Sequence, residues 1–145
     1  MRRLLAPALL PALLAAVVST ALGGPSRAAE AAADPDIQST ITAQIDAFGE
    51  GDAARAESFA SPGIKSMFPD ASAFYGMVKQ SYGALVHPRS THFEPTVTAE
   101  GGAVQHVTVV DSDGVVWTAV YSLEKVDGHW AISGCVLVKS KETTA

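Results

Sequence analysis

Two tight turns in the C-terminal half constrain the fold of this chain more than any other feature. Residues 126–129, VDGH, form a typical two-residue hairpin turn, and residues 111–114, DSDG, fit a three-residue loop with Gly114 in the left-handed conformation. The turns separate stretches of alternating apolar and polar residues, which indicate strands over 103–110, 115–126 and 129–138. A fourth alternating stretch around 93–97 precedes them. We therefore expect an antiparallel meander of four main strands.

The two turns also predict which residues face one another across the strands. The first turn places Gln105 beside Tyr121, and the second places Leu123 beside Ile132 and Tyr121 beside Gly134. A shift of one residue would send every side chain to the opposite face of the sheet. In this register one face gathers the large apolar residues and is expected to lie under helices: Val107, Val109, Trp117, Ala119, Tyr121, Leu123, Trp130 and Ile132.

The segment before residue 90 has a helical period instead. A first helix is indicated by apolar residues that recur at spacings of four, four and three: Ile37, Ile41, Ile45 and Phe48. Asp36 is its expected N-cap, and Asp52 and Asp70 are expected to begin two further helices. Residues 64–68 suggest a short edge strand. The predicted fold class is therefore α+β, with three N-terminal helices packed on one face of an antiparallel sheet of four main strands.

The first 33 residues have the order of a secretory signal peptide. Basic residues at the start precede an apolar run, and small residues follow it. The rival interpretation, an uncleaved membrane anchor, is disfavoured by Pro7 and Pro11 within the run. We expect residues 1–33 to be removed and a single domain over 34–145 to be exported, to the periplasm or outside the cell.

The composition of the remaining domain argues against several partners. Residues 34–145 hold seven basic and fourteen acidic residues, which gives a net charge of about −7. An acidic domain is a poor match for nucleic acid, and we expect neither nucleic-acid binding nor membrane attachment after signal cleavage.

Three segments together resemble a known family. They are FASP at residues 59–62, F-x-x-M-V-x-x-x-Y at 74–82 and DG-x-W-x-I-x-GC at 127–135. This chain resembles, over residues 37–138, a group of small bacterial proteins catalogued as domain-of-unknown-function family 4864. The wider architecture is similar to the nuclear transport factor 2-like cone shared with ketosteroid isomerase and polyketide cyclases. The resemblance implies a curved, cone-like sheet with a conical pocket between helices and sheet, and it implies no particular activity.

A small-molecule pocket is the leading functional hypothesis. Gln105 and Tyr121 are polar groups on a mainly apolar face, which is how small-molecule sites are usually built. The alternative for Gln105 is a buried amide with a purely structural hydrogen bond. We expect a small apolar or amphipathic ligand and no cofactor, with these ligand-binding residues: Gln105, Tyr121, Tyr82, Phe48 and Trp117.

The sequence holds no motif that specifies a reaction. There is no G-x-S-x-G, no phosphate-binding glycine loop and no histidine or cysteine spacing typical of a metal site, so we predict no catalytic or metal-binding residue. An isomerase-like or cyclase-like enzyme remains an alternative. It would use Asp46 as a general base and Tyr121 as an oxyanion donor.

The single cysteine raises a separate question. The predicted register places Cys135 beside Val120 on the outer face of the sheet, together with Val116 and Leu137. A lone thiol in an oxidising compartment is a buried small hydrophobe, half of an intermolecular disulfide or a reactive group. Since an apolar outer face marks an interaction surface, we expect a homodimer through it. A protein-interaction module that uses this face is the third functional hypothesis.

Overall fold

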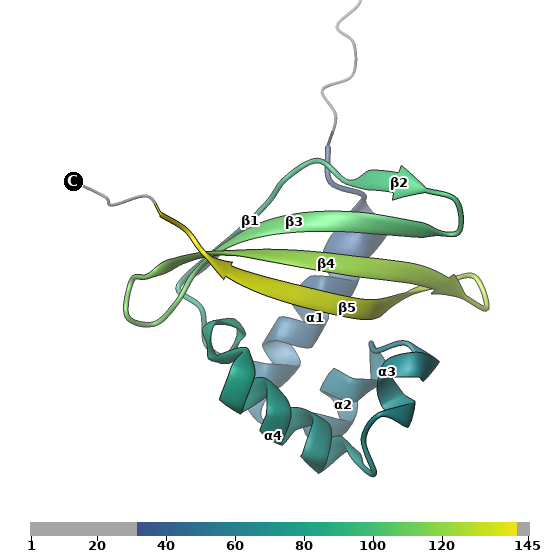
Figure 1. Cartoon of the computed structure of the whole chain (residues 1–145), viewed down its shortest axis with the longest axis horizontal. Coiled ribbons are helices and arrows are strands. Elements are labelled where there is room, and N and C mark those ends of the chain that lie inside the picture. The colour runs from purple at the N-terminus through teal and green to yellow at the C-terminus, as the bar shows by residue number, and fades with distance from the viewer. Residues whose placement is uncertain (1–31, 142–145) are drawn as a thin grey trace, which may run out of the picture.

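A computed structural model describes residues 32–141 as one α+β unit (Figure 1). The predicted signal peptide lies outside the described residues, apart from Ala32 and Ala33. Within residues 32–141, none of the helices is both long and apolar enough to cross a membrane.

The helices come first along the chain. They are α1 (Pro35–Glu50), α2 (Ala53–Ser58), α3 (Pro62–Ser66), α4 (Ala71–Ser81) and the short 3-10 helix η1 (Gly83–Leu85). Asp52 and Asp70 accept hydrogen bonds from amides of the first turns of α2 and α4, so both predicted caps are confirmed. The cap of α1 is Asp34 and not Asp36, because Pro35 already occupies the first helical position.

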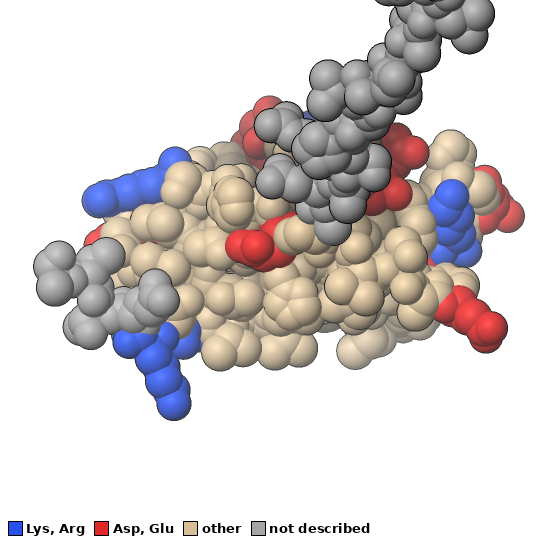
Figure 2. All heavy atoms as spheres, turned by 90° about the horizontal axis from the view of Figure 1, so that it is seen from above, with Lys and Arg blue, Asp and Glu red and all other residues tan. Residues whose placement is uncertain are grey.

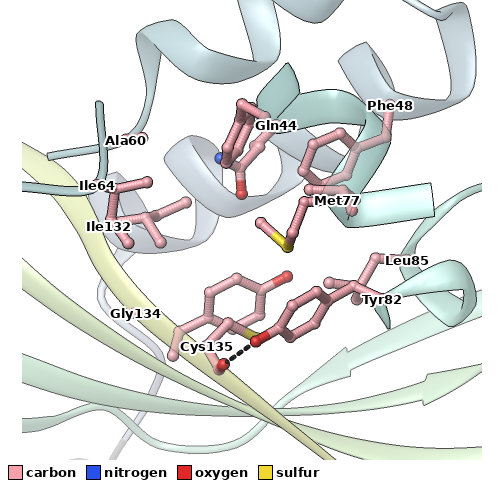
Figure 3. A pocket seen from close by; sticks show the side chains of 13 residues that line it. Gln44, Phe48, Ala60, Ile64, Met77, Tyr82, Leu85, Ile132, Gly134 and Cys135 are labelled. Carbon is pink, nitrogen blue, oxygen red and sulfur yellow. Dashed lines mark hydrogen bonds between the residues drawn. The ribbon is translucent and has the colours of Figure 1, made fainter. Parts of the chain in front are cut away.

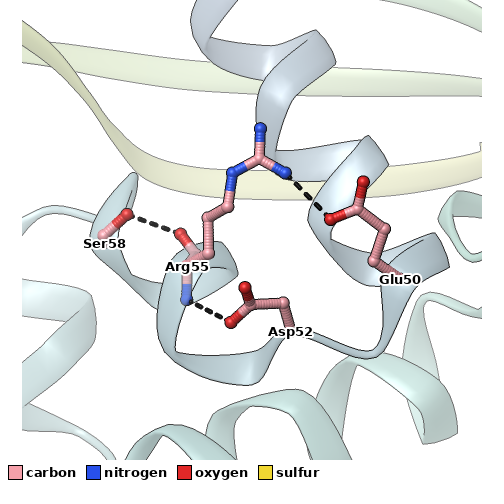
Figure 4. A network of polar contacts seen from close by, with 4 residues as sticks. All are labelled: Glu50, Asp52, Arg55 and Ser58. Atoms are coloured by element: carbon pink, nitrogen blue, oxygen red, sulfur yellow. Dashed lines mark hydrogen bonds and ion pairs between the residues drawn. The ribbon is translucent and has the colours of Figure 1, made fainter.

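The junction between α1 and α2 is short and polar. Gly51 ends α1 with a φ of 70°, a conformation that glycine adopts without a steric penalty. Arg55 then forms an ion pair of 3.1 Å with Glu50, while its backbone amide donates to Asp52 (Figure 4). Both side chains of the ion pair are exposed, so the pair contributes little to stability.

The expected edge strand over 64–68 is wrong. This segment belongs to α3 and the turn after it. The Ser61 hydroxyl oxygen accepts a hydrogen bond from the Ile64 amide and so caps the helix. Pro62 lies in the first turn, where a backbone N–H would have no partner within the helix, so its missing N–H costs nothing.

The strands form one open antiparallel sheet. They are β1 (Ser90–Phe93), β2 (Val97–Ala99), β3 (Gly102–Val110), β4 (Val116–Val126) and β5 (His129–Lys139). The order is β1-β3-β4-β5, and β2 also pairs with β3 beyond the end of β1. Figure 1 shows α2, α3 and α4 below the sheet and α1 crossing behind its strands.

The first predicted strand is divided into β1 and β2. Pro95 has no N–H for the ladder, so pairing with β3 stops there. The side chain of Gln105 fills the break: its amide donates to the carbonyl oxygens of Glu94 (2.6 Å) and His106 (2.9 Å) and accepts from the Thr96 hydroxyl.

The predicted register is confirmed for β3–β4 and only in part for β4–β5. Gln105 lies opposite Tyr121, and Leu123 lies opposite Ile132. A β-bulge then inserts Ser133, so Tyr121 faces Cys135 and not Gly134. Beyond the bulge every side chain of β5 lies on the face opposite to the predicted one.

The bulge rearranges both faces of the sheet. Cys135 and Leu137 are inward and pack against the core, which corrects their expected place on the outer face. Val136 and Val138 point outward and are 61% and 51% exposed. The core between the layers is apolar, with Gln44 and Gln105 as its largest buried polar side chains.

Candidate functional site

An apolar cavity of about 70 Å³ lies between the helices and the sheet (Figure 3). Residues from α1, α3, α4, η1, β4 and β5 surround it. They are Gln44, Phe48, Ala60, Ile64, Phe74, Met77, Val78, Tyr82, Leu85, Tyr121, Ile132, Gly134 and Cys135. None of these lining residues carries a carboxylate, ammonium or guanidinium group, so the walls within the described chain are uncharged.

Hydrogen bonds between helix and sheet segments connect the walls of the cavity. The Tyr82 hydroxyl donates to the Cys135 carbonyl oxygen at 2.9 Å, as Figure 3 shows. The Ser61 amide donates to the Ile132 carbonyl at 2.8 Å, and the Ile132 amide donates to Phe59. These bonds tie β5 to the segments that follow α2 and α4, so the cavity walls are fixed relative to each other.

Gln44 supplies a polar group to the helical side of the cavity. Its side chain is 4% exposed, and its Nε2 donates to the Ala56 carbonyl oxygen at 3.1 Å. Because a carbonyl can only accept, this bond fixes which end of the amide is nitrogen. Figure 3 shows the amide oxygen of Gln44 directed toward Met77, into the cavity.

Tyr121 supplies a polar group on the sheet side. The residue is 1% exposed, and its hydroxyl has no hydrogen-bond partner among residues 32–141. Burial, together with the nearby Cys135, raises the pKa of Tyr121 well above its ordinary value of 10.0. The phenol therefore stays protonated at neutral pH and offers a hydrogen-bond donor to the cavity.

Cys135 lines the same cavity as an inert thiol. Burial raises the pKa of Cys135 from 9.0 to about 12. Since the thiolate is the reactive form, a thiol with this pKa is a weak nucleophile at neutral pH. The inward position supports the buried-hydrophobe alternative for Cys135 and argues against an intermolecular disulfide, because the residue lines the interior cavity and not the outer surface.

Three of the five predicted site residues line the cavity: Tyr121, Tyr82 and Phe48. Gln105 and Trp117 lie outside it. Gln105 is fully buried in the network at the β1–β2 break, which is the structural alternative considered above. The Trp117 indole donates to Asp111 at 2.9 Å, and this bond is the main reason why the pKa of Asp111 is lowered.

Sequence reasoning missed two polar lining residues. Gln44 had a detectable signal, because it lies three residues after Ile41 and four before Phe48, on the apolar face of α1. For Cys135 the signal was weak: its inward position depends on the β-bulge, of which only the neighbouring Gly134 gave an indication.

The predicted acid–base pair of the enzyme hypothesis is not assembled. Asp46 is exposed on α1 and is absent from the cavity lining, whereas Tyr121 is buried inside. Across residues 32–141, no three histidine, cysteine or acidic side chains are grouped in a way that could hold a metal ion. The cavity thus offers hydrogen-bond donors and acceptors within apolar walls.

Comparison with known proteins places the chain in a family. Residues 30–145 match the family described as Domain of unknown function (DUF4864), and the chain belongs to it. A search of curated proteins gives no match.

Solved structures show the same fold. An NTF-2-like protein of unknown function from Silicibacter pomeroyi is similar with a TM-score of 0.52 and 15% identity, covering 72% of this chain and 93% of that one. An NTF2-like protein of unknown function from Shewanella baltica has a TM-score of 0.52 at 12% identity, with 74% and 93% covered. The protein Aln2 from a Streptomyces species has a TM-score of 0.50 at 14% identity, with 74% and 93% covered. The chain therefore has an NTF-2-like α+β fold.

Proposed function

We propose that the protein is a non-catalytic binding module for a small, mainly apolar molecule that occupies the cavity between helices and sheet. The observation that supports this proposal is the apolar cavity without charged lining residues between the helices and the sheet. The fold supports the proposal, because NTF-2-like proteins often bind small molecules. Binding is favoured over catalysis because the Cys135 thiol stays protonated and Asp46 lies outside the cavity.

The size of the cavity limits the ligand. A water molecule needs roughly 15 Å³ of comparable space, so about 70 Å³ has room for a molecule of several non-hydrogen atoms. Met77 extends into the middle of the cavity (Figure 3). Methionine side chains are flexible and repack readily, so a larger ligand is accommodated when the Met77 side chain moves aside.

Filling the cavity is expected to abolish binding without unfolding the protein. Ala60→Leu adds three carbons at a residue that lines the cavity. We expect binding of a small probe such as cyclohexanone to fall at least tenfold, while the free energy of unfolding falls by no more than about 1–3 kcal/mol. Calorimetric titration measures the binding, and urea denaturation measures the stability.

The matched control is Ala54→Leu on the exposed surface of α2, which adds the same atoms outside the cavity. This variant should bind the probe as the wild type does. Unchanged binding by folded Ala60→Leu would mean that the probe binds elsewhere and that the cavity is not the site.

We also propose that two copies associate through the outer face of the sheet. By register this face carries mainly β-branched and small side chains, and Glu124 near the end of β4 is its one carboxylate among the paired residues of β3, β4 and β5. The other residues on it include Val104, His106, Thr108, Val110, Val116, Thr118, Val120, Ser122, Val136 and Val138. The exported domain has a net charge of about −7, so copies repel each other least across a surface that carries few charges. Figure 2, seen from above, shows basic residues near the two ends of the molecule and mainly uncharged residues between them, with acidic residues among these.

A charge on this outer face is expected to dissociate the dimer. In an isologous dimer Val136→Glu places two carboxylates at one interface, and we expect the dissociation constant to rise at least tenfold in sedimentation equilibrium. Met67→Glu, at a 71% exposed residue after α3, is the control. A wild-type protein that stays monomeric at every concentration tested would refute the dimer.

Export completes the proposed function. The order of basic, apolar and small residues over 1–33 supports a cleaved leader, so the binding domain would act in the periplasm or outside the cell. The intact mass of protein recovered from the periplasmic fraction tests this. A chain that stays in the cytoplasm at full length would contradict it.

A further inference from the structure

We propose that the ligand is an uncharged molecule with a carbonyl, ether or hydroxyl oxygen, and that this oxygen accepts a hydrogen bond from the Tyr121 hydroxyl. The inference rests on the proposed function and defines its ligand class. Two observations carry it: the unpartnered Tyr121 hydroxyl in the cavity, and the absence of any charged group from the lining of the described cavity.

The three tyrosines of the chain show how unusual Tyr121 is. The Tyr75 hydroxyl donates to the Phe48 carbonyl oxygen at 2.8 Å, and the Tyr82 hydroxyl donates to the Cys135 carbonyl oxygen at 2.9 Å. Tyr121 is the most buried of the three, and its hydroxyl alone lacks a partner within residues 32–141. A buried hydroxyl without a partner lowers stability, so a phenylalanine would serve the free fold better. A ligand oxygen that accepts a hydrogen bond from the Tyr121 hydroxyl explains why this position carries a tyrosine.

The uncharged lining selects against ionic ligands. A carboxylate could accept from Tyr121, but no cationic side chain lines the cavity to compensate for its lost hydration. An ammonium group meets the same difficulty, because the phenol remains neutral and no carboxylate lines the walls. A neutral oxygen satisfies the donor without burying an unpaired charge.

Gln44 adds a second preference on the opposite side of the cavity. Its nitrogen is engaged by Ala56, so its oxygen is the group presented to a ligand. This oxygen accepts from an O–H or N–H group. The ligand is thus oriented with an acceptor toward the sheet, and a donor, where it has one, toward α1. Apolar atoms between these two ends contact Met77.

Three probes of similar size test the inference: cyclohexanone, methylenecyclohexane and cyclohexanecarboxylate. The first two differ only in C=O against C=CH₂, and the third carries a charge. We expect the wild type to bind the ketone about tenfold more tightly than the alkene, because one buried hydrogen bond contributes roughly 1.4 kcal/mol to binding. We expect the carboxylate to bind more weakly than either. Calorimetry or NMR titration gives the three dissociation constants.

Tyr121→Phe removes the proposed donor and keeps the ring. This variant should lose the tenfold preference for the ketone while binding the alkene as before. Its melting temperature should stay the same or rise, because an unpartnered hydroxyl is removed. Tyr75→Phe is the matched control: it removes a bonded hydroxyl outside the cavity lining, so its melting temperature should fall and its ketone preference should persist.

The outcomes separate this inference from the proposed function. Equal binding of ketone and alkene by the wild type, or an unchanged ketone preference in Tyr121→Phe, would overturn the inference and leave the apolar binding site intact. Tightest binding of the carboxylate would overturn the neutral ligand class. Failure of all three probes to bind would overturn the proposed function itself.

Discussion

Gln105→Leu is expected to lower the free energy of unfolding by about 3 kcal/mol. The side chain is 0% exposed and satisfies the carbonyl oxygens of Glu94 and His106 and the hydroxyl of Thr96. Each such hydrogen bond contributes about 1 kcal/mol, and a buried acceptor left without a donor costs about 1–3 kcal/mol. Leucine has nearly the same size, so the loss measures the hydrogen bonds rather than a cavity.

Urea denaturation gives this difference, and Gln80→Leu on the exposed side of α4 is the control. An exposed substitution of this kind should change stability by no more than about 0.5 kcal/mol. A loss below about 1 kcal/mol for Gln105→Leu would show that the network does not hold the β1–β2 break.

The second large effect is a loss of stability as the pH rises above 9. Burial raises the pKa of Cys135 from 9.0 to about 12, and burial also raises the pKa of Tyr121 above 10.0. Both groups are neutral in the folded state and lose a proton more easily when unfolded. Their stabilisation is therefore complete below the unfolded pKa and is lost as the pH climbs toward the folded pKa. Each group contributes a slope of about 1.4 kcal/mol per pH unit in its own range.

Cys135→Ser separates this effect from general alkaline destabilisation. Between pH 9 and 10 only the thiol of the two groups ionises in the unfolded chain, so the slope of stability against pH should be flatter in the variant. Urea denaturation at a series of alkaline pH values measures both slopes. Parallel curves for wild type and Cys135→Ser would show that the thiol ionises as freely in the folded protein as in the unfolded one.

Much of the fold could be predicted because local signals agreed with the tertiary structure. The turn at 126–129 has φ values of 51° at Asp127 and 79° at Gly128, as its sequence indicates, and the caps at Asp52 and Asp70 are those expected. Two of the predicted strands were wrong for reasons that are visible in the sequence. Pro95 interrupts the first strand, and Ser61-Pro62 begins a helix where a strand was expected.

The candidate site was less predictable because it depends on a β-bulge. Gly134 is compatible with a β-bulge at Ser133 but does not require one, and the bulge decides that Cys135 lies beside Tyr121 on the sheet wall of the cavity. Because of the same shift in register, Val136 and Val138 lie on the outer face, whereas Leu137, which was expected there, lies on the inner face. Tyr121 itself was predictable, since its strand pairs with β3 through a turn that fixes the register.

The central claim is that small neutral molecules bind in the cavity, and the methyl groups of the methionines test it most directly. Met77 lines the cavity, while Met67 is 71% exposed after α3 and serves as an internal control. We would label the methionine methyl carbons with ¹³C and titrate the protein with cyclohexanone. We expect the Met77 resonance to shift saturably while the Met67 resonance stays in place. A saturable shift of Met67 with Met77 unchanged, or no shift of either at saturating probe, would contradict binding in the cavity.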